Sequence, residues 1–494
     1  MTPHARVAGA LLGCTIMLSG CTLLGPDFSR PPAPIESEWL DTGNPRLSTQ
    51  PTVDTKWWQA AYGDPVLDQL VADALQENLS LRSAGLRVLQ SQQQLAIAVG
   101  NQYPQQQQIA GGASKQREDG DTFKDYNVGF NLSWEVDFWG SFRRQVESAS
   151  AALDASVADF DGALVSLVSQ VAQTYILIRT NQSRLDVARR NVSLQEESLR
   201  IARAKLDAGD VSELDVDQAE SLLNNTRASV PALQSTLQQL KNTLAILLGK
   251  PPQDLTYLLG QKRSIPLAPA QIALGMPQDL IRQRPDIRAA ERRMASQSAQ
   301  IGVAEAELYP SLSIGGSIGT DAADSSDLFN NSSESWSLFA AFQWNIFNYG
   351  RLKSNVRLQD ARFQQLLVDY QNTVLQAQGD VENAIVAYLK SYEQLAAYRA
   401  AASASQRSVD TSTSQYQNGL IPFNTVISTL RSDAQQQDLL VSTRGDVAAK
   451  LVQVYRALGG GWEIREGRDP VELLPAQMKE EMEARTGAWD GQLK

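Results

Sequence analysis

The sequence predicts a mostly helical, internally duplicated chain that contributes four membrane-type β-strands to a barrel shared between copies. Two stretches of about 66 residues each contain one glycine and no proline, which is typical of very long helices. The two halves of the chain match each other at a constant spacing. Each half also contains a segment in which apolar and polar residues alternate, which is typical of a β-strand with two different faces.

Length and charge set the first limits. The chain has 494 residues, more than a single compact core needs. It carries 44 Lys and Arg against 55 Asp and Glu, a formal charge of −11. Because phosphates would repel so acidic a surface, a nucleic-acid partner is not expected.

The cysteines and the histidine lie at one end. They are His4, Cys14 and Cys21, so removal of a signal peptide leaves no histidine and at most one cysteine. This excludes a structural disulfide, a Cys/His zinc site and a Ser–His or Cys–His nucleophile pair. Chemistry based on carboxylates alone or on a Ser–Lys pair stays open, but no motif points to it. We expect no catalytic residue, no metal, no cofactor and no enzymatic activity.

Residues 1–20 have the features of a secretion signal. Arg6 precedes the apolar run 7–18, which is too short to span a bilayer. Leu-Ser-Gly then precedes Cys21, and this is similar to the bacterial lipoprotein signal, in which that cysteine is lipidated. We therefore expect a covalent lipid on Cys21 and, because Thr22 follows, sorting to the outer membrane. A plain signal peptide with an incidental cysteine is the alternative; Cys14 has almost no apolar run before it.

The elements follow in the same order in both halves. Residues 21–64 are rich in Pro, Ser and Thr and predict an extended arm, on which Trp57 and Trp58 either dock the arm or simply pack on a groove. The first repeat, 65–284, is expected to contain helix 65–101, strands at about 105–115 and 125–138, a long helix 142–208 and a return helix 211–248, bent at Pro231. The second repeat, 285–461, is expected to contain helix 285–308, strands at about 311–319 and 335–347, a long helix 351–417 and a return helix 423–458, before a charged, mobile tail at 462–494.

The duplication can be followed residue by residue. Four pairs of landmarks are 210 residues apart: Trp134 and Trp344, Gly140 and Gly350, Gly209 and Gly419, Gly249 and Gly459. Upstream of the strands the spacing is 206, because Tyr103-Pro104 matches Tyr309-Pro310. The strand loops therefore differ by four residues in length.

The alternating segments carry a membrane signal. From 126 to 138 every even position is apolar and the odd positions are polar or glycine, with Glu135 and Asp137 among them. The expected apolar face also includes Ile109, Gly111, Ala113, Leu312, Ile314, Gly316, Ile318, Trp336, Leu338, Ala340, Phe342, Trp344 and Ile346. Polar loops are expected at 115–125 and 320–335. This is the pattern of a barrel with apolar residues toward lipid and with Glu135 and Asp137 toward the lumen; the alternative is a soluble hairpin packed on its own helices.

Four strands cannot close a membrane barrel. Unpaired backbone groups at an open edge cost several kcal/mol each in lipid. A dimer would supply eight strands and a trimer twelve. A lumen that passes solutes favours twelve, because side chains fill an eight-stranded barrel.

The order of elements and several motifs resemble one known family. The motifs are Arg284-Pro285-Asp286-Ile287, the segment 134–140 (Trp-Glu-Val-Asp-Phe-Trp-Gly) and Ala208-Gly209. They are similar to the TolC-like outer-membrane efflux proteins, in the lipoprotein branch with OprM and the NodT-like proteins. The resemblance implies a homotrimer with a 12-stranded β-barrel continuous with a 12-helix periplasmic α-barrel. It also implies an equatorial region to which 249–284 and 459–494 contribute, and passage of drugs, metals or other solutes from an inner-membrane pump through a periplasmic adaptor.

Two other classes of protein stay open. A type I protein-secretion duct shares this architecture, and the lipoprotein signal favours efflux. A periplasmic coiled-coil scaffold would not need the alternating strand.

The resemblance places the turns at Gly209 and Gly419 at the periplasmic tip, where the duct closes and meets the adaptor. Acidic residues crowd the first turn: Asp207, Asp210, Glu213, Asp215 and Asp217. They either form a constriction favouring cations or serve as N-cap and first-turn residues of the return helix, a role that Asp210 and Glu213 fit. Leu420, Ile421 and Phe423 at the second turn either contact the adaptor or close the tip. The family's usual Leu and Asp after this glycine are replaced by Asn424 and Ser428.

Overall fold

The computed structural model describes residues 22–48, 50, 55–260, 264–269, 271–465, 467–489 and 491–493, so the expected signal peptide and Cys21 lie outside the described residues. The chain divides into two compact units. Unit 1 comprises 1–32, 87–157 and 289–372, and unit 2 comprises 33–86, 158–288 and 373–494.

The helices confirm the duplication. Helices α5 and α10 each have 67 residues, α6 and α11 each have 35, and α4 and α9 each have 22. Their bounds, with those of α3, are α3 Pro65–Glu77, α4 Leu79–Gly100, α5 Ser141–Asp207, α6 Glu213–Leu247, α9 Pro285–Ala306, α10 Arg351–Gln417 and α11 Phe423–Ala457. Helix α6 continues through Pro231. None of the helices in the described ranges combines the length and apolarity needed to cross a membrane.

The helix expected at 65–101 is two helices. Asn78 lies between them in an extended conformation, its N–H donates to Ala74 O, and its side chain accepts from Leu81 N at 2.9 Å. Its side-chain amide also donates to Leu247 O. These local bonds give the backbone an alternative to a continuous helix, which the apolar periodicity alone did not reveal.

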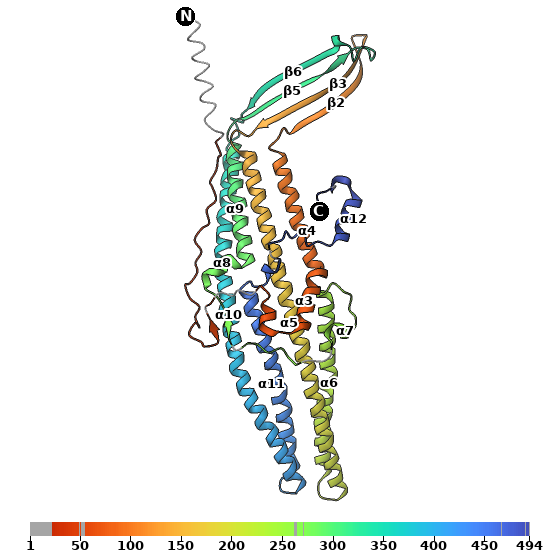
Figure 1. Cartoon of the computed structure of the whole chain (residues 1–494), viewed down its shortest axis with the longest axis vertical. Coiled ribbons are helices and arrows are strands. Elements are labelled where there is room, and N and C mark those ends of the chain that lie inside the picture. The colour runs from red at the N-terminus through yellow and green to blue at the C-terminus, as the bar shows by residue number, and fades with distance from the viewer. Residues whose placement is uncertain are drawn as a thin grey trace. The chain divides into compact units, whose positions relative to one another are not determined.

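Four strands form one antiparallel sheet in the order β2-β3-β5-β6, drawn side by side in Figure 1. Their bounds are β2 Gln106–Glu118, β3 Asp121–Val136, β5 Ser311–Ala322 and β6 Glu334–Gln343. The loop expected at 115–125 is wrong. The strands pair through Lys115 and Lys124 and reverse at Asp119-Gly120, where φ is +52° and +98°. Two central residues with positive φ suit the right-handed twist of a hairpin, so a charged sequence still pairs. Strands β3 and β6 also end earlier than expected.

The arm and the tail contain more structure than the sequence suggested. Within the arm lie α2 Trp57–Tyr62 and β1 Leu47–Ser48, which pairs in parallel with β4 Ile272–Ala273. The remaining short elements are α7 Thr256–Leu259, η1 Pro277–Asp279, α8 Leu280–Gln283, η2 Asn331–Ser333, η3 Trp462–Arg465, α12 Ala476–Arg485 and η4 Gly487–Trp489.

Side chains of the arm and the tail are buried in unit 2. Trp57 is 1 % exposed and stacks on Tyr455 with ring centroids 4.8 Å apart, so packing is its role. In the tail, Arg465 donates to the fully buried Asp161 at 2.6 Å, and Leu474 lies against Gly85. These contacts attach the first part of the tail to the helices, which its charged sequence did not suggest; the mobility of the tail stays a prediction.

Candidate functional site: the sheet and the helix tips

One face of the sheet is apolar across all four strands. Ile109, Phe130, Ile318 and Trp336 are direct neighbours in register. Residues that lie directly opposite each other project to the same face. Further rows on this face join Leu132, Gly316 and Leu338, and join Trp134, Ile314 and Ala340. The face predicted from the sequence is confirmed up to the strand ends; Trp344 and Ile346 lie beyond β6.

The opposite face is polar. Gln108, Asn131, Ser317 and Ser337 form one of its rows, and the last two hydroxyls are 2.8 Å apart. Phe339 is an exception, with its ring over Gly315.

Nothing in the described part of the chain covers the apolar face. Ile109 is 79 % exposed and Trp336 78 %. A soluble hairpin packed on its own helices is therefore excluded, because such packing would bury these side chains. A contiguous exposed apolar surface of this kind marks contact with lipid or another apolar partner.

The two acidic residues predicted for the lumen have different positions. Glu135 is exposed on the polar face, opposite Ser313. Asp137 lies beyond β3, where its carboxylate accepts from the backbone N–H groups of Phe142 and Arg143 at 3.0 and 2.9 Å. Asp137 thus holds the start of α5, and its place in the lumen stays a prediction. A carboxylate there also suits the positive end of the helix dipole.

Both turns predicted at the tips close in the same way. Gly209 and Gly419 have φ of +79° and +73°, a conformation that glycine adopts without strain. After α5, Asp210 N donates to Lys205 O and Gly209 N to Leu206 O; after α10, Leu420 and Gly419 repeat both bonds. These are the paired bonds of a Schellman motif, which satisfies the last carbonyls of each long helix.

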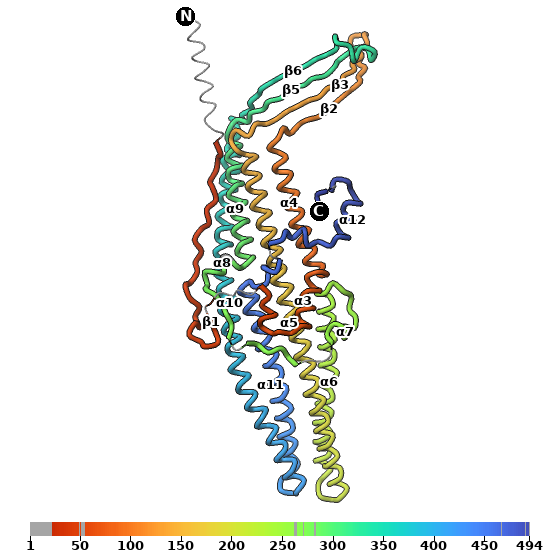
Figure 2. Tube along the Cα trace, viewed as in Figure 1, coloured from red at the N-terminus to blue at the C-terminus, as the bar shows by residue number. Residues whose placement is uncertain are grey.

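The two helix pairs of unit 2 share an apolar cluster near their turns, which lie at the same end in Figure 2. Its buried members are Leu199, Ala202, Val216, Ala219, Leu222, Leu223, Val409, Tyr416, Phe423, Val426, Ile427 and Leu430. The sequence drew attention to the turn residues and missed this cluster, although its members repeat at helical spacing.

Tyr416, which precedes the apolar turn, also lies close to side chains of the acidic turn. It is 4 % exposed, and Lys205 Nζ lies 4.9 Å from its ring centre. Burial, then the nearby carboxylates of Asp215 and Asp210, raise the pKa of Tyr416. The Tyr416 hydroxyl has no hydrogen-bond partner in the described part of the chain.

The acidic residues of the first turn are mostly exposed. Asp207, Asp210, Glu213 and Asp217 are exposed, and Asp215 is half-buried. Ser212, not Asp210, holds the N-cap position of α6, and its side chain makes no capping bond. Glu213 and Asp215 do lie in the first helical turn. Both readings of this acidic group therefore stay compatible with the geometry, except for Asp210 as N-cap.

The apolar residues of the second turn divide into surface and core. Leu420 is 72 % exposed. Ile421 packs against the apolar cluster, and Phe423 is 2 % exposed within it. Phe423 therefore cannot be a surface contact, as the sequence left open, because its ring packs against Tyr416 at 5.0 Å. Leu214 at the first turn, 62 % exposed, is a surface residue that the sequence did not single out.

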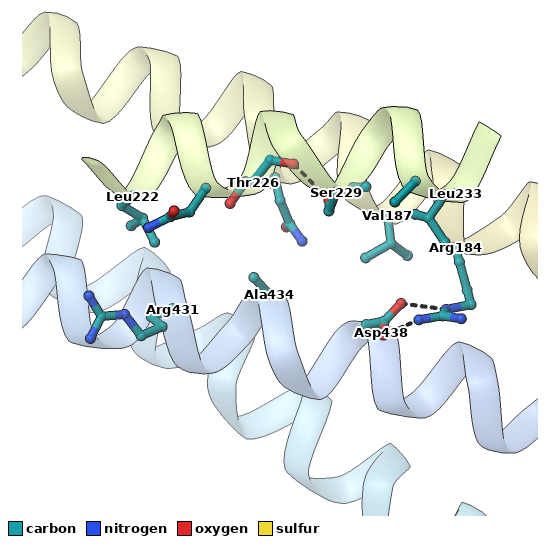
Figure 3. A pocket seen from close by; sticks show the side chains of 13 residues that line it. Arg184, Val187, Leu222, Thr226, Ser229, Leu233, Arg431, Ala434 and Asp438 are labelled. Atoms are coloured by element: carbon teal, nitrogen blue, oxygen red, sulfur yellow. Dashed lines mark hydrogen bonds and ion pairs between the residues drawn. The ribbon is translucent and has the colours of Figure 1, made fainter. Parts of the chain in front are cut away.

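Farther from the turns a groove of about 510 Å³ separates the helix pairs (Figure 3). Arg184 of α5 and Asp438 of α11 close one end of it with two hydrogen bonds of 2.8 and 2.9 Å. Thr180 lies one turn away on α5, where its side chain fills the space beside Gly445. The Arg184–Asp438 pair was not predicted from the sequence, because the two residues are 254 positions apart.

No group of His, Cys, Asp and Glu in the described ranges could hold a metal ion. The candidate sites described above are a sheet with one apolar and one polar face and two closed helix turns.

Comparisons with known proteins agree with this geometry. The profile of the outer membrane efflux protein family matches residues 70–250 and 276–460. The pyoverdine export outer membrane protein OpmQ of Pseudomonas aeruginosa is 31 % identical over 90 % of this chain and 96 % of its own length. The cation efflux system protein CusC of Escherichia coli O157:H7 is 28 % identical over 91 % and 97 %.

The solved structure of the outer-membrane channel OprN aligns with a TM-score of 0.84 at 30 % identity, covering 89 % of this chain and all of that one. The family profile matches most of both repeats and leaves out residues 251–275, near the end of the first repeat. The chain therefore belongs to the outer membrane efflux protein family.

Proposed function

We propose that three copies of this chain form the outer-membrane duct of a tripartite efflux system, which passes solutes outward from a periplasmic adaptor and an inner-membrane pump. Channels of this family form homotrimers and work with such partners. The role needs no catalytic residue, no bound metal and no cofactor other than a covalent lipid. What this duct carries is not fixed by family, because OpmQ and CusC are named for pyoverdine and for cations.

The four-stranded sheet carries this proposal. Its apolar face suits lipid, and the outer edges of β2 and β6 have no neighbour in the described part of the chain. Open edges are too costly within a bilayer, so the sheet must continue into other copies. Twelve strands then enclose a lumen lined by the polar rows, including Glu135.

A lipid on Cys21 would add an anchor. The residues that follow it are firmly attached in unit 1. The guanidinium of Arg144, 1 % exposed, donates to Leu24 O at 2.9 Å and to Gly25 O at 3.0 Å, and it pairs with Asp27. The segment that begins three residues after Cys21 is therefore attached to the start of α5.

The tip would close the duct and meet the adaptor. The acidic side chains of the first turn and the exposed Leu214 and Leu420 are available at its surface. Asp207, Asp210, Glu213 and Asp217 would be repeated three times around the axis and favour cations at the entrance.

Efflux measured in cells that depend on this protein tests the proposal. We would delete the gene, then restore it as wild type, as Cys21→Ser and with Gly inserted between Asp210 and Val211 to distort the tip. Sensitivity to dyes, drugs and metal ions would be measured with the outer-membrane level of each protein. We expect deletion to raise sensitivity to at least one class of solute, wild type to restore it, and the distorted tip to fail at normal protein level. Unchanged sensitivity to every class, together with loss of a secreted protein, would contradict efflux and favour a secretion duct.

A further inference from the structure

The contact between the two repeats inside the chain provides a template for the contact between copies. Trp139, at the end of the first hairpin, stacks on Tyr309 of the second repeat with centroids 4.6 Å apart. Its indole N–H donates to Pro310 O at 2.8 Å. This joint fixes the passage from strand to helix where one repeat meets the next.

The duplication reproduces contacts at the level of single atoms. In the first repeat, Trp134 Nε1 donates to Gln102 O at 3.2 Å; in the second, Trp344 Nε1 donates to Leu308 O at 3.0 Å. The two donors are 210 residues apart and the two acceptors 206. These two spacings therefore identify, for a contact made in one repeat, the residues that would make the equivalent contact in the other repeat.

Applied to the joint, the same spacings point outside the chain. Trp139 corresponds to Tyr349 in the second repeat, and Tyr309-Pro310 corresponds to Tyr103-Pro104 in the first. Within one chain these residues have no such contact, since Tyr349 is fully exposed and Tyr103 is 64 % exposed. Both belong to unit 1, at its first and last strands.

The backbone at Tyr349 gives a second, independent sign of a missing neighbour. Its φ is +49°, a left-handed conformation that costs about 1–2 kcal/mol for a residue other than glycine. Such strain persists only where surroundings hold it in place. In the described part of the chain nothing covers this side chain, which leaves it available for a contact with another copy.

We propose that Tyr349 of one copy stacks on Tyr103 of the neighbouring copy, beside its Pro104, and that β6 joins the neighbour's β2 in the register of β3 with β5. This rests on the proposed function, because it requires the copies to share one barrel. It goes further by assigning the residues and the register of the seam.

The register follows from the strand starts. Strand β2 begins at Gln106 and β5 at Ser311, 205 residues apart, because Gln105 is an extra residue after Pro104. The pair Phe130–Ile318 between β3 and β5 therefore corresponds to a pair between β6 and the neighbour's β2, in which Ala340 lies opposite Ala113 of the neighbouring copy. The shift of 205 also keeps the apolar face continuous, because the apolar positions of β2 are odd-numbered and those of β6 even-numbered.

Cysteine cross-linking in the intact outer membrane tests the register. The native cysteines are Cys14 and Cys21, so the parent chain is the control for background. Ala113→Cys with Ala340→Cys places two small residues directly opposite, at a Cβ separation of about 4.5–5.5 Å. Two matched controls combine Ala113→Cys with Leu338→Cys or Phe342→Cys, each displaced by two residues to about 7–8 Å. We expect oxidation to link the first pair into dimers and trimers and the displaced pairs far less.

The outcomes separate this proposal from the proposed function. If the protein is trimeric but a displaced pair links best, or no pair links, the register is wrong and the duct stands. If the protein is monomeric in the membrane, the shared duct itself fails.

The tyrosine contact has its own test. We expect Tyr349→Ala and Tyr103→Ala each to lower the temperature at which the trimer dissociates in detergent, and the double variant to lower it no further than either single change. Phe347→Ala is the matched control, since this neighbouring side chain is 88 % exposed and aligns with Asp137 rather than with Trp139. Fully additive effects of the two tyrosine changes would overturn the stacking contact.

Discussion

Single residues at the helix tips decide which side chains are available to a partner. Leu420 and Phe423 are three residues apart and both apolar, yet one is exposed and the other buried. The sequence predicted the turn glycines because left-handed backbone restricts residue choice. It could not separate Leu420 from Phe423, because burial here depends on the second helix pair packing across the tip.

We predict opposite behaviour for Phe423→Ala and Leu420→Ala. Removing the buried ring leaves a cavity in the apolar cluster and costs about 3–5 kcal/mol. Removing the exposed side chain changes stability by less than about 0.5 kcal/mol. Thermal unfolding, monitored through the circular dichroism signal of the helices, measures the stability of both variants. If Leu420→Ala reduces transport at unchanged stability, Leu420 contacts a partner; equal destabilisation by the two changes would contradict the packing described.

Glu463 provides a pH-dependent test in the tail. Burial raises the pKa of Glu463, with Asp161 adding to the effect and hydrogen bonds from the backbone opposing it. A carboxyl whose pKa is raised on folding contributes stability below its usual pKa, and this is lost as pH rises through the folded value. We expect Glu463→Gln to increase the melting temperature slightly at neutral pH and to change nothing near pH 4. A melting temperature that falls at neutral pH would show that the ionised form is favoured by its surroundings.

Among the elements, the long helices and the strand faces were predictable and the connections were not. Helix α10 has the expected bounds, because 67 residues without proline leave few alternatives. The β2–β3 loop was misjudged, because Lys115 to Asp125 looks polar enough for a loop but continues to pair. The break at Asn78 and the role of Asp137 depend on local side-chain bonds, which periodicity does not report.

Adjacent positions of β5 test the two faces of the sheet. Ile318 lies in the apolar row with Phe130 and Trp336, and Ser317 lies in the polar row with Asn131 and Ser337. An arginine facing lipid costs about 2–4 kcal/mol near the bilayer midplane. We therefore expect Ile318→Arg to reduce the folded protein in the outer membrane severalfold and Ser317→Arg to leave it nearly unchanged.

Protein level in isolated outer membranes and heat-modifiable migration measure this difference. The two arginine variants differ only in the face that receives the charge. Equal tolerance of both changes would mean that the apolar face does not contact lipid.

At the scale of the whole molecule, the duplication was the most informative feature of the sequence. It predicted repeats of equal helix length, and it converts contacts inside one chain into expected contacts between copies. What it could not show was the packing between the repeats, such as Arg184 with Asp438, where the halves differ in sequence. The role of Cys21 also stays a prediction, and mass spectrometry of the mature N-terminus would measure its lipid.

The central claim is that the four-stranded sheet is completed only by other copies of the chain. The most direct measurement is the mass of the purified, unheated protein in mild detergent, by light scattering corrected for bound detergent. The account predicts a single species with three times the mass of one chain, which separates into monomers on heating. A monodisperse monomer that retains its strand content and still inserts into lipid would contradict it.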